Sequence, residues 1–112
     1  MKTLVIIPAR CGSKGIKDKN IIDVCGKPLI AYSIEPAMKL LNENFVDEVI
    51  VSTDCEKIAN IAKLYGAKVP FMRPKSIAGD KAKSIEFILH AIEFYEQKNI
   101  FFDAVLLLQP TS

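Results

Sequence analysis

Strand-length apolar runs alternate with amphipathic segments along the whole chain, and this alternation limits the possible folds more than any other feature. The runs with the length of buried strands are residues 3–8, 48–53, 68–72 and 104–108. The segments with apolar residues at helical spacing are residues 28–43, 56–65 and 84–98. Strands that alternate with helices predict a protein of the α/β class, with a parallel sheet covered by helices on both faces.

The predicted sheet has three crossovers that join its four strands. Right-handed crossovers and the usual doubly wound arrangement predict the strand order 3-2-1-4, numbered along the chain. We therefore expect a three-layer, Rossmann-like fold with a mainly parallel sheet. Gly66 is predicted to end the second helix, Asp54 to cap its start, and Pro36 to kink or interrupt the first. In the third helix we expect one buried stripe of apolar residues: Ile85, Ile88, Leu89, Ile92 and Tyr95.

Composition removes several classes of protein. Half of the residues are hydrophobic and a quarter are charged, as in globular domains and unlike disordered or collagenous chains. No apolar run approaches the roughly 20 residues that span a bilayer, so we expect no membrane segment. Cys11, Cys25 and Cys55 lack CxxC spacing, which argues against a disulfide framework or zinc site and predicts a cytoplasmic protein.

The net charge of +2 conceals two strongly basic segments. Residues 9–20 and residues 73–83 each carry four basic side chains and one acidic one, a net of +3 apiece, so the rest of the chain carries −4. Both segments follow predicted strands and should project from the carboxyl edge of the sheet, where α/β proteins bind ligands. Local concentration of charge predicts a polyphosphate site rather than a surface for nucleic acid. A solvated basic face is the alternative for either segment alone.

The loop after the first strand, ARCGSKGIKDKN, matches neither the dinucleotide fingerprint G-x-G-x-x-G nor the P-loop motif. Its physical logic is similar, because Gly12 and Gly15 let backbone N–H groups approach an anion closely. Arg10 is suited to bind phosphate oxygens through two donors, and Lys14 and Lys19 add point charges. The alternative is a flexible basic loop without a ligand.

A longer set of motifs is more specific. It consists of IIPARCGSKGIKDKNI, GKPLIAYSIE, VIVSTD, AKLYGAKVPFMRPKSIAGDKAKS and LLLQPTS, in this order. This pattern resembles the cytidylyltransferases that activate sialic acid-type sugars (CMP-N-acylneuraminate synthetases and their pseudaminic and legionaminic acid relatives). The resemblance implies a nucleotidyltransferase fold and the transfer of CMP from CTP to a nine-carbon 2-keto acid sugar, with release of pyrophosphate.

The resemblance also implies roles for residues of the first loop. Arg10 and Lys14 would hold the triphosphate, and Lys19 or Arg10 would stabilise the charge that develops during phosphoryl transfer. The other nucleotide-binding positions that it implies in this loop are Gly12, Ser13 and Asn20, the last for the ribose. Cys11 stands where many relatives have Gly, and would be strained if that position needs positive φ.

Two later segments match the base and the sugar sites of the same family. Arg73 would approach the cytosine. The segment that usually reads Asp-Thr-Ala-x-Ser supplies the positions Asp80, Ala82 and Ser84, with Lys81 and Lys83 departing from the pattern. The implied sugar-binding positions are Gln109, Thr111 and Ser112. Lys81 and Lys83 are interpreted equally well as added phosphate contacts or as solvated side chains.

The resemblance further implies Mg²⁺ as cofactor, a homodimer, and a role in lipopolysaccharide or capsule biosynthesis. We interpret residues 1–112 as the N-terminal, nucleotide-binding portion of one cytidylyltransferase domain, a truncated form of the fold. The metal ligands are expected outside this chain, which alone should bind CTP weakly without turnover. The alternatives are a Kdo-type or other sugar nucleotidyltransferase, and a non-catalytic nucleotide-binding fragment. His90, Tyr32, Phe87 and Phe94 are interpreted as packing residues.

Overall fold

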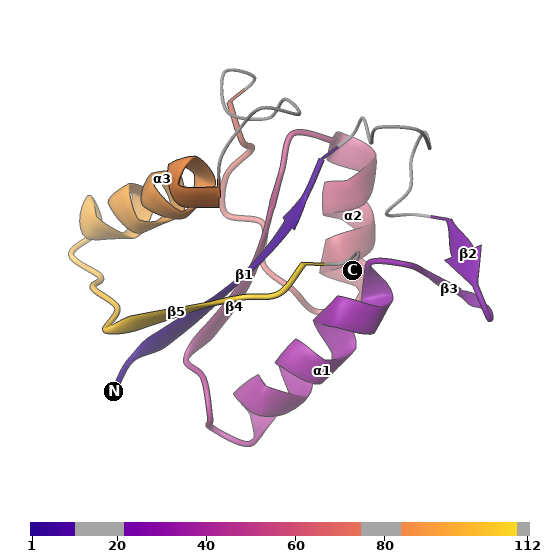
Figure 1. The fold of residues 1–112 in the computed structure, drawn as a ribbon, viewed down its shortest axis with the longest axis horizontal. Helices are drawn as coiled ribbons and strands as arrows, with labels where there is room; N and C mark the ends of the chain where they lie inside the picture. Colours follow the sequence, from indigo (N-terminus) through magenta and orange to yellow (C-terminus); the bar gives the residue numbers. More distant parts are fainter. Residues whose placement is uncertain (11–21, 75–83, 110–112) are drawn as a thin grey trace.

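The computed structural model describes residues 1–10, 22–74 and 84–109, and its centre is a parallel sheet. Strand β1 (Thr3–Ala9) lies between β4 (Glu48–Thr53) and β5 (Ala104–Leu107), so that the order is β4-β1-β5 (Figure 1). In this register Ile6 pairs with Ile50 on one side and with Leu107 on the other. Three of the four predicted strands therefore form, in the predicted order.

The predicted third strand is the exception. Residues 68–72 run beside β4 but make only an isolated parallel bridge, between Lys68 and Ile50. The N–H of Lys68 donates to the Val49 carbonyl at 3.1 Å, and the Val51 N–H donates to the Lys68 carbonyl at 2.9 Å. The ladder stops there because Pro70 has no N–H to donate. The segment thus lies on the side of β4 that the order 3-2-1-4 assigns to it, without being a strand.

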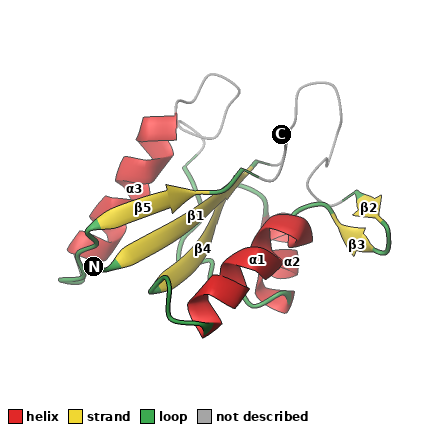
Figure 2. Ribbon diagram, turned by 60° about the horizontal axis from the view of Figure 1, so that its bottom comes forward, coloured by secondary structure: helices red, strands yellow, loops and turns green. Residues whose placement is uncertain are grey.

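Helices cover both faces of the sheet. Helices α1 (Ala31–Asn42) and α2 (Glu56–Leu64) lie on one face, and α3 (Ser84–Glu96) lies on the other (Figure 2). Successive residues of β1 enter the two resulting cores in turn: Val5 packs with α1 and α2, whereas Ile6 packs with α3. Because both faces of β1 are fully buried, its sequence is continuously apolar, and the three-layer prediction is confirmed.

The buried stripe of α3 matches the predicted one only in part, since Tyr95 is buried as predicted and Ile88 packs partly buried against the core. The residues that face the sheet are Phe87, Ala91 and Tyr95, whereas Ile85 is 54% exposed and Leu89 is 47% exposed. The prediction followed the apolar periodicity of the helix, and α3 is apolar on more than one side. Only contact with Leu4, Ile6 and Ile50 selects the face that is buried.

Helices α1, α2 and α3 end in the same backbone motif, with one residue at positive φ after the last turn. Gly66 follows α2 with φ of 98°, and the next residue, Ala67, donates its N–H to the carbonyl of Ala62 at 3.1 Å. Asn44 after α1 and Asn99 after α3 take φ values of 65° and 61° in equivalent positions. These are Schellman motifs, which satisfy the last carbonyls of a helix. The prediction that Gly66 ends α2 is confirmed.

The Gly66→Ala variant is expected to lower the free energy of unfolding by about 1–2 kcal/mol, because a Cβ is unfavourable at positive φ. Space is not the obstacle, since the new Cβ would lie 3.4 Å from the flexible end of Met38. The control is Asn99→Gly, which removes a Cβ at a position of the same kind and should not destabilise the protein. Urea unfolding measures both variants, and a Gly66→Ala protein as stable as the wild type would contradict the prediction.

The segment before α1 holds a small hairpin that the sequence analysis did not predict. Strands β2 (Asp23–Val24) and β3 (Lys27–Pro28) pair antiparallel around a two-residue turn. Cys25 has φ of 52° and Gly26 has φ of 89°, the signs that a type I′ turn requires at its two central positions. A Cys-Gly pair is a weaker sequence signal for this turn than Asn-Gly, which is why the hairpin was missed.

Helix α1 therefore begins later than predicted. Pro28 lies in β3 and is not a residue of the first helical turn, and the helix starts at Ala31. Pro36 lies inside the helix, which continues through it to Asn42. The side chain of Pro36 is exposed, so its ring meets solvent instead of the core.

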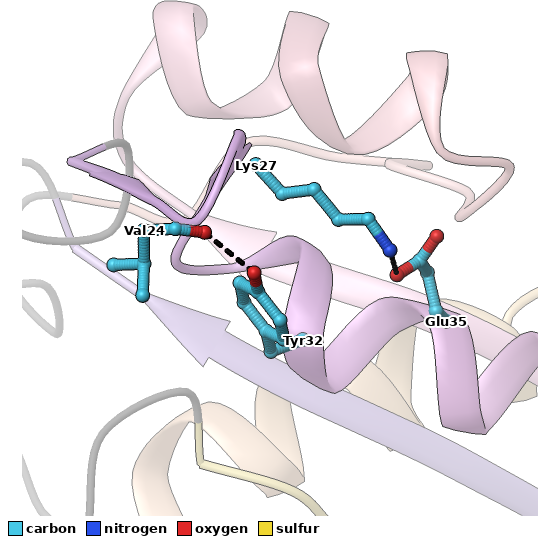
Figure 3. Close-up of polar contacts among 4 residues, drawn as sticks. All are labelled: Val24, Lys27, Tyr32 and Glu35. Atoms are coloured by element: carbon cyan, nitrogen blue, oxygen red, sulfur yellow. Dashed lines mark hydrogen bonds and ion pairs between the residues drawn. The ribbon is translucent and has the colours of Figure 1, made fainter.

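Side chains of α1 hold this hairpin in place (Figure 3). Lys27 forms an ion pair with Glu35, with 2.7 Å between Nζ and Oε1. The hydroxyl of Tyr32 donates to the carbonyl of Val24. Tyr32 is 41% exposed, so it is not the packing residue that the sequence suggested. Its role in the structure is the hydrogen bond that joins α1 to the hairpin. These two contacts thus join α1 to the hairpin, which follows the first basic segment in the sequence.

Strand β5 forms one edge of the sheet in the described residues. It pairs with β1 alone there, and its Leu106 is 38% exposed. None of the helices in the described ranges is long and apolar enough to cross a membrane.

Candidate functional site

The structure brings one arginine from each basic segment to the same edge of the sheet. Ala9 pairs with Thr53 at the carboxyl ends of β1 and β4, and Arg10 is the next residue after Ala9. Arg73 reaches the same place from the other side of β4, because its backbone N–H donates to the Thr53 carbonyl at 2.7 Å. Both strands end on this side of the molecule (Figure 1). This edge is where parallel α/β sheets bind ligands.

The side chain of Arg73 is nearly buried and is held from two directions. Its Nε donates to the Ser52 hydroxyl at 3.1 Å, and its Nη2 donates to the Ser52 carbonyl at 2.7 Å. The guanidinium carbon lies 4.7 Å from the ring centroid of Phe87 on α3, in a cation–π arrangement. Only 6% of Arg73 is exposed. A charged group of this kind is buried only where hydrogen bonds compensate for its lost hydration.

The electrostatics of this edge favour a bound anion. Burial lowers the pKa of Arg73, the carboxylate of Asp54 opposes this shift, and the positive charge of Arg10 adds to it. An arginine nevertheless stays protonated at neutral pH, so two guanidinium groups repel each other here. Both positive charges would attract an anion at this edge.

Asp54 does not cap α2, contrary to the prediction. The N-cap position is Cys55, whose side chain makes no capping hydrogen bond. Instead the backbone N–H of Cys55 donates to Oγ1 of the preceding Thr53 at 3.0 Å. The carboxylate of Asp54 lies close enough to Arg73 to act on its pKa. Asp54 therefore contributes negative charge to this edge.

Gln109 lies beyond the end of β5, on the other side of β1. The N–H of Leu108 still donates to the Ile6 carbonyl at 3.0 Å, and Gln109 follows with an exposed side chain. Ser84 is the first residue of α3. The edge thus presents Arg10 at its centre, Arg73 beyond β4 and Gln109 beyond β5.

The other predicted site residues lie outside the described part of the chain. They are Gly12, Ser13, Lys14, Lys19, Asn20, Asp80, Ala82, Thr111 and Ser112, together with the departures Cys11, Lys81 and Lys83. In the described ranges no group of three or more His, Cys, Asp or Glu side chains is placed to hold a metal ion.

Sequence reasoning missed the two residues that hold Arg73. Ser52 is fully buried although it is polar, and Phe87 was assigned to packing alone. The available signal was the run EVIVST, in which hydroxyl side chains replace apolar ones at the end of a buried strand. A polar residue in such a position needs a partner, and here that partner is an arginine 21 residues further along the chain.

His90 lies beside this cluster and packs against it. Its ring meets Phe71 edge to face, with 4.6 Å between centroids, and its Nδ1 is buried without a hydrogen bond to the described residues. Burial lowers the pKa of His90, and the charge of Arg73 lowers it further, against an opposing effect of Glu93. These contacts agree with the packing interpretation of His90.

The pKa of His90 is expected to lie below that of an unfolded histidine, which is about 6.5. Because the unfolded chain then takes up a proton first, stability is full above pH 6.5 and is lost as the pH falls from there through the folded pKa. The signal of the Cε1 proton, followed by NMR during an acid titration, measures this pKa directly. A folded pKa at or above that of an unstructured His peptide would contradict the prediction, and His90→Gln should abolish this part of the pH dependence of stability.

Comparison with known proteins identifies the fold and the family of the chain. A solved structure of CMP-2-keto-3-deoxy-manno-octonic acid synthetase complexed with CTP superposes with a TM-score of 0.76 at 25% identity, over 98% of this chain and 40% of that one. The fold is therefore that of a sugar-activating nucleotidyltransferase. The family model described as cytidylyltransferase matches residues 4–105, and the chain belongs to the cytidylyltransferase family.

Relatives within this family activate nonulosonic acids, according to their names. A pseudaminic acid cytidylyltransferase of Campylobacter jejuni is 50% identical over 112 residues, and a CMP-N,N'-diacetyllegionaminic acid synthase of Legionella pneumophila is 44% identical over the same length. An N-acylneuraminate cytidylyltransferase of Escherichia coli is 46% identical over 111 residues. These matches cover at least 99% of this chain, which spans 47%, 47% and 25% of the three relatives. The resemblance inferred from the motifs is confirmed.

Proposed function

We propose that the complete gene product transfers CMP from CTP to the anomeric hydroxyl of a nine-carbon 2-keto acid sugar. The observation that carries this proposal is the identity of 44–50% to enzymes named for pseudaminic, legionaminic and N-acylneuraminic acids, along the whole of this chain. The pair of arginines at the carboxyl edge of the sheet supports it, because a nucleoside triphosphate is the kind of polyanion that such a pair attracts.

The reaction needs charge stabilisation more than a protein nucleophile. The anomeric oxygen forms a bond to the α-phosphorus of CTP, the bond from that phosphorus to the bridging oxygen breaks, and pyrophosphate leaves. The hydroxyl proton passes to a base or to water. Negative charge builds on the phosphate oxygens, where positively charged donors lower the barrier. We assign this task to Arg10, which follows the central strand, and to Lys19 of the first loop.

The remaining site residues are proposed from their positions in the family motifs. Arg73 approaches the nucleotide from beyond β4, and Gln109 approaches the sugar from beyond β5. The other proposed nucleotide-binding positions are Gly12, Ser13, Lys14, Asn20, Asp80, Ala82 and Ser84. Thr111 and Ser112 complete the proposed sugar-binding set.

We also propose Mg²⁺ as cofactor, which would supply positive charge to the triphosphate when bound. The resemblance to the family implies that its ligands lie beyond this chain. A cytoplasmic homodimer that supplies activated sugar for lipopolysaccharide or capsule is proposed with it. The cysteine pattern supports the cytoplasmic location.

The test is a pyrophosphate-release assay on the complete gene product with CTP, Mg²⁺ and one sugar acid at a time. The sugars are pseudaminic, legionaminic, N-acetylneuraminic and 2-keto-3-deoxy-manno-octonic acids. We expect turnover with at least one of the three nine-carbon acids and at least tenfold lower kcat/KM with the eight-carbon acid. Preference for the eight-carbon acid would support the alternative of a Kdo-type enzyme, and CTP binding without turnover of any sugar would support a non-catalytic role.

A further inference from the structure

Ser52 and Phe87 together fix the orientation of the Arg73 guanidinium. The two hydrogen bonds to Ser52 use Nε and Nη2, which lie along one side of the planar group. The guanidinium carbon also lies over the ring of Phe87, 4.7 Å from its centroid. Ser52 is fully buried and Phe87 is 6% exposed, so bulk water does not compete for either contact.

This arrangement leaves a defined set of donors. A guanidinium carries five N–H groups, and Ser52 takes two of them. The remaining donors include both N–H groups of Nη1 and one of Nη2, at the end of the side chain. In the part of the chain that the structure describes, these donors make no further hydrogen bond. Their place is set by the Thr53 carbonyl, which binds the backbone N–H of Arg73 at the carboxyl end of β4.

An arginine held in this way loses little conformational freedom when it binds a ligand. A free arginine side chain gives up rotamer entropy when it is ordered, whereas one that is already ordered by its neighbours does not. Preorganisation of this kind improves affinity without adding a contact to the ligand. Ser52 belongs to β4 and Phe87 to α3, so that two regular elements of the fold contact the Arg73 side chain.

We propose that Ser52 and Phe87 are positioning residues, which aim the end-on N–H pair of Arg73 at an acceptor oxygen of bound CTP. This inference rests on the proposed function. The acceptor oxygen belongs either to the triphosphate or to the pyrimidine ring, since both offer the chemistry that a guanidinium recognises.

A purely structural role for the same contacts makes a different prediction. If Ser52 and Phe87 served only to bury Arg73, their loss would lower stability and leave the affinity of the folded protein for CTP unchanged. A positioning role requires a weaker affinity in a protein that is still folded, with a larger effect on KM for CTP than on kcat.

The experiment compares Ser52→Ala and Phe87→Leu with matched controls in the complete gene product. Phe94→Leu is the control for Phe87, because Phe94 lies on the same helix and packs on Phe71 and Tyr95 without contacting Arg73. Ser33→Ala on α1 is the control for Ser52. Ser52→Cys is a second variant at the site itself, which keeps the volume and offers only a weak acceptor. Thermal melting reports whether each variant is folded.

Calorimetry with CTP, with CMP and with inorganic tripolyphosphate provides the affinities. Loss of one hydrogen bond to a charged group is expected to weaken CTP binding about tenfold in Ser52→Ala and by a smaller factor in Ser52→Cys and Phe87→Leu. The two controls should bind CTP as the wild type does. A parallel loss for tripolyphosphate would assign the acceptor to the phosphates, and a loss confined to CTP and CMP would assign it to the nucleoside.

Two results would overturn the inference. One is unchanged CTP affinity in folded Ser52→Cys and Phe87→Leu proteins, and the other is an equal loss in Phe94→Leu, which would show that affinity follows stability alone. A wild-type protein that does not bind CTP would overturn the proposed function as well. Wild-type binding with unaffected variants would leave the proposed function intact and reject only the role of Ser52 and Phe87.

Discussion

Replacing Arg10 by alanine is expected to lower kcat/KM of the complete gene product for CTP by about 10²–10³-fold, the effect typical of removing one preorganised donor from a phosphoryl-transfer site. Arg10 leaves the central strand directly beside Thr53, at the point where β1 and β4 end. The strand that Arg10 follows is deeply buried, and this burial restricts the backbone conformation just before Arg10.

The control for this variant removes a positive charge far from the proposed site. Lys39 lies in the last turn of α1 and is exposed, and Lys39→Ala should retain the wild-type kcat/KM. Arg10→Lys distinguishes charge from geometry, because a lysine keeps the charge but cannot bind two phosphate oxygens in one plane. Steady-state kinetics with CTP varied at saturating sugar measures all three. Wild-type activity in Arg10→Ala would remove Arg10 from the proposed machinery.

Replacing Ile6 by alanine is expected to lower the free energy of unfolding by about 2–5 kcal/mol. Ile6 is fully buried in the central strand, between Ile50 and Leu107, and packs with the residues beneath α3. Such a loss is a large part of the roughly 5–15 kcal/mol that stabilises a typical domain. The residues around Ile6 belong to two strands and a helix, so that the cavity cannot close by moving one side chain.

Urea unfolding of the complete gene product measures this loss, with Leu64→Ala as the matched control. Leu64 is 83% exposed at the end of α2, and its replacement should change stability by less than about 0.5 kcal/mol. Equal effects of the two replacements would mean that the sheet is not the main source of stability in this part of the protein.

Both predictions concern the same strand, which links the core to the site. Val5 and Ile7 face one core and Leu4 and Ile6 face the other, so β1 is packed on both sides up to the residue that precedes Pro8. Arg10 lies two residues after Pro8. The proposed site thus adjoins a fully buried strand, the kind of support that a preorganised charge needs.

Local patterns were sufficient for the class of fold and for the family. Strand-length apolar runs, helical spacing and the glycine after α2 depend on residues close together in the chain. Strands β1, β4 and β5 and helices α2 and α3 form close to where these patterns place them, and α1 begins three residues later than predicted. The motifs around Arg10 and Arg73 identify the family because each motif is a short contiguous stretch of sequence that can be compared without knowledge of the fold.

Only the tertiary structure decided which strands pair, which face of α3 is buried and which residues hold Arg73. The predicted third strand, residues 68–72, makes only a single bridge to β4. Contact with the sheet selects the face of α3 that carries Phe87, and a hairpin forms around Cys25 and Gly26. The support of Arg73 by Ser52 and Phe87 depends on contacts between residues far apart in the sequence. The local sequence indicates only that the buried hydroxyl of Ser52 needs a partner, and the packing of β4 against α3 decides that this partner is Arg73.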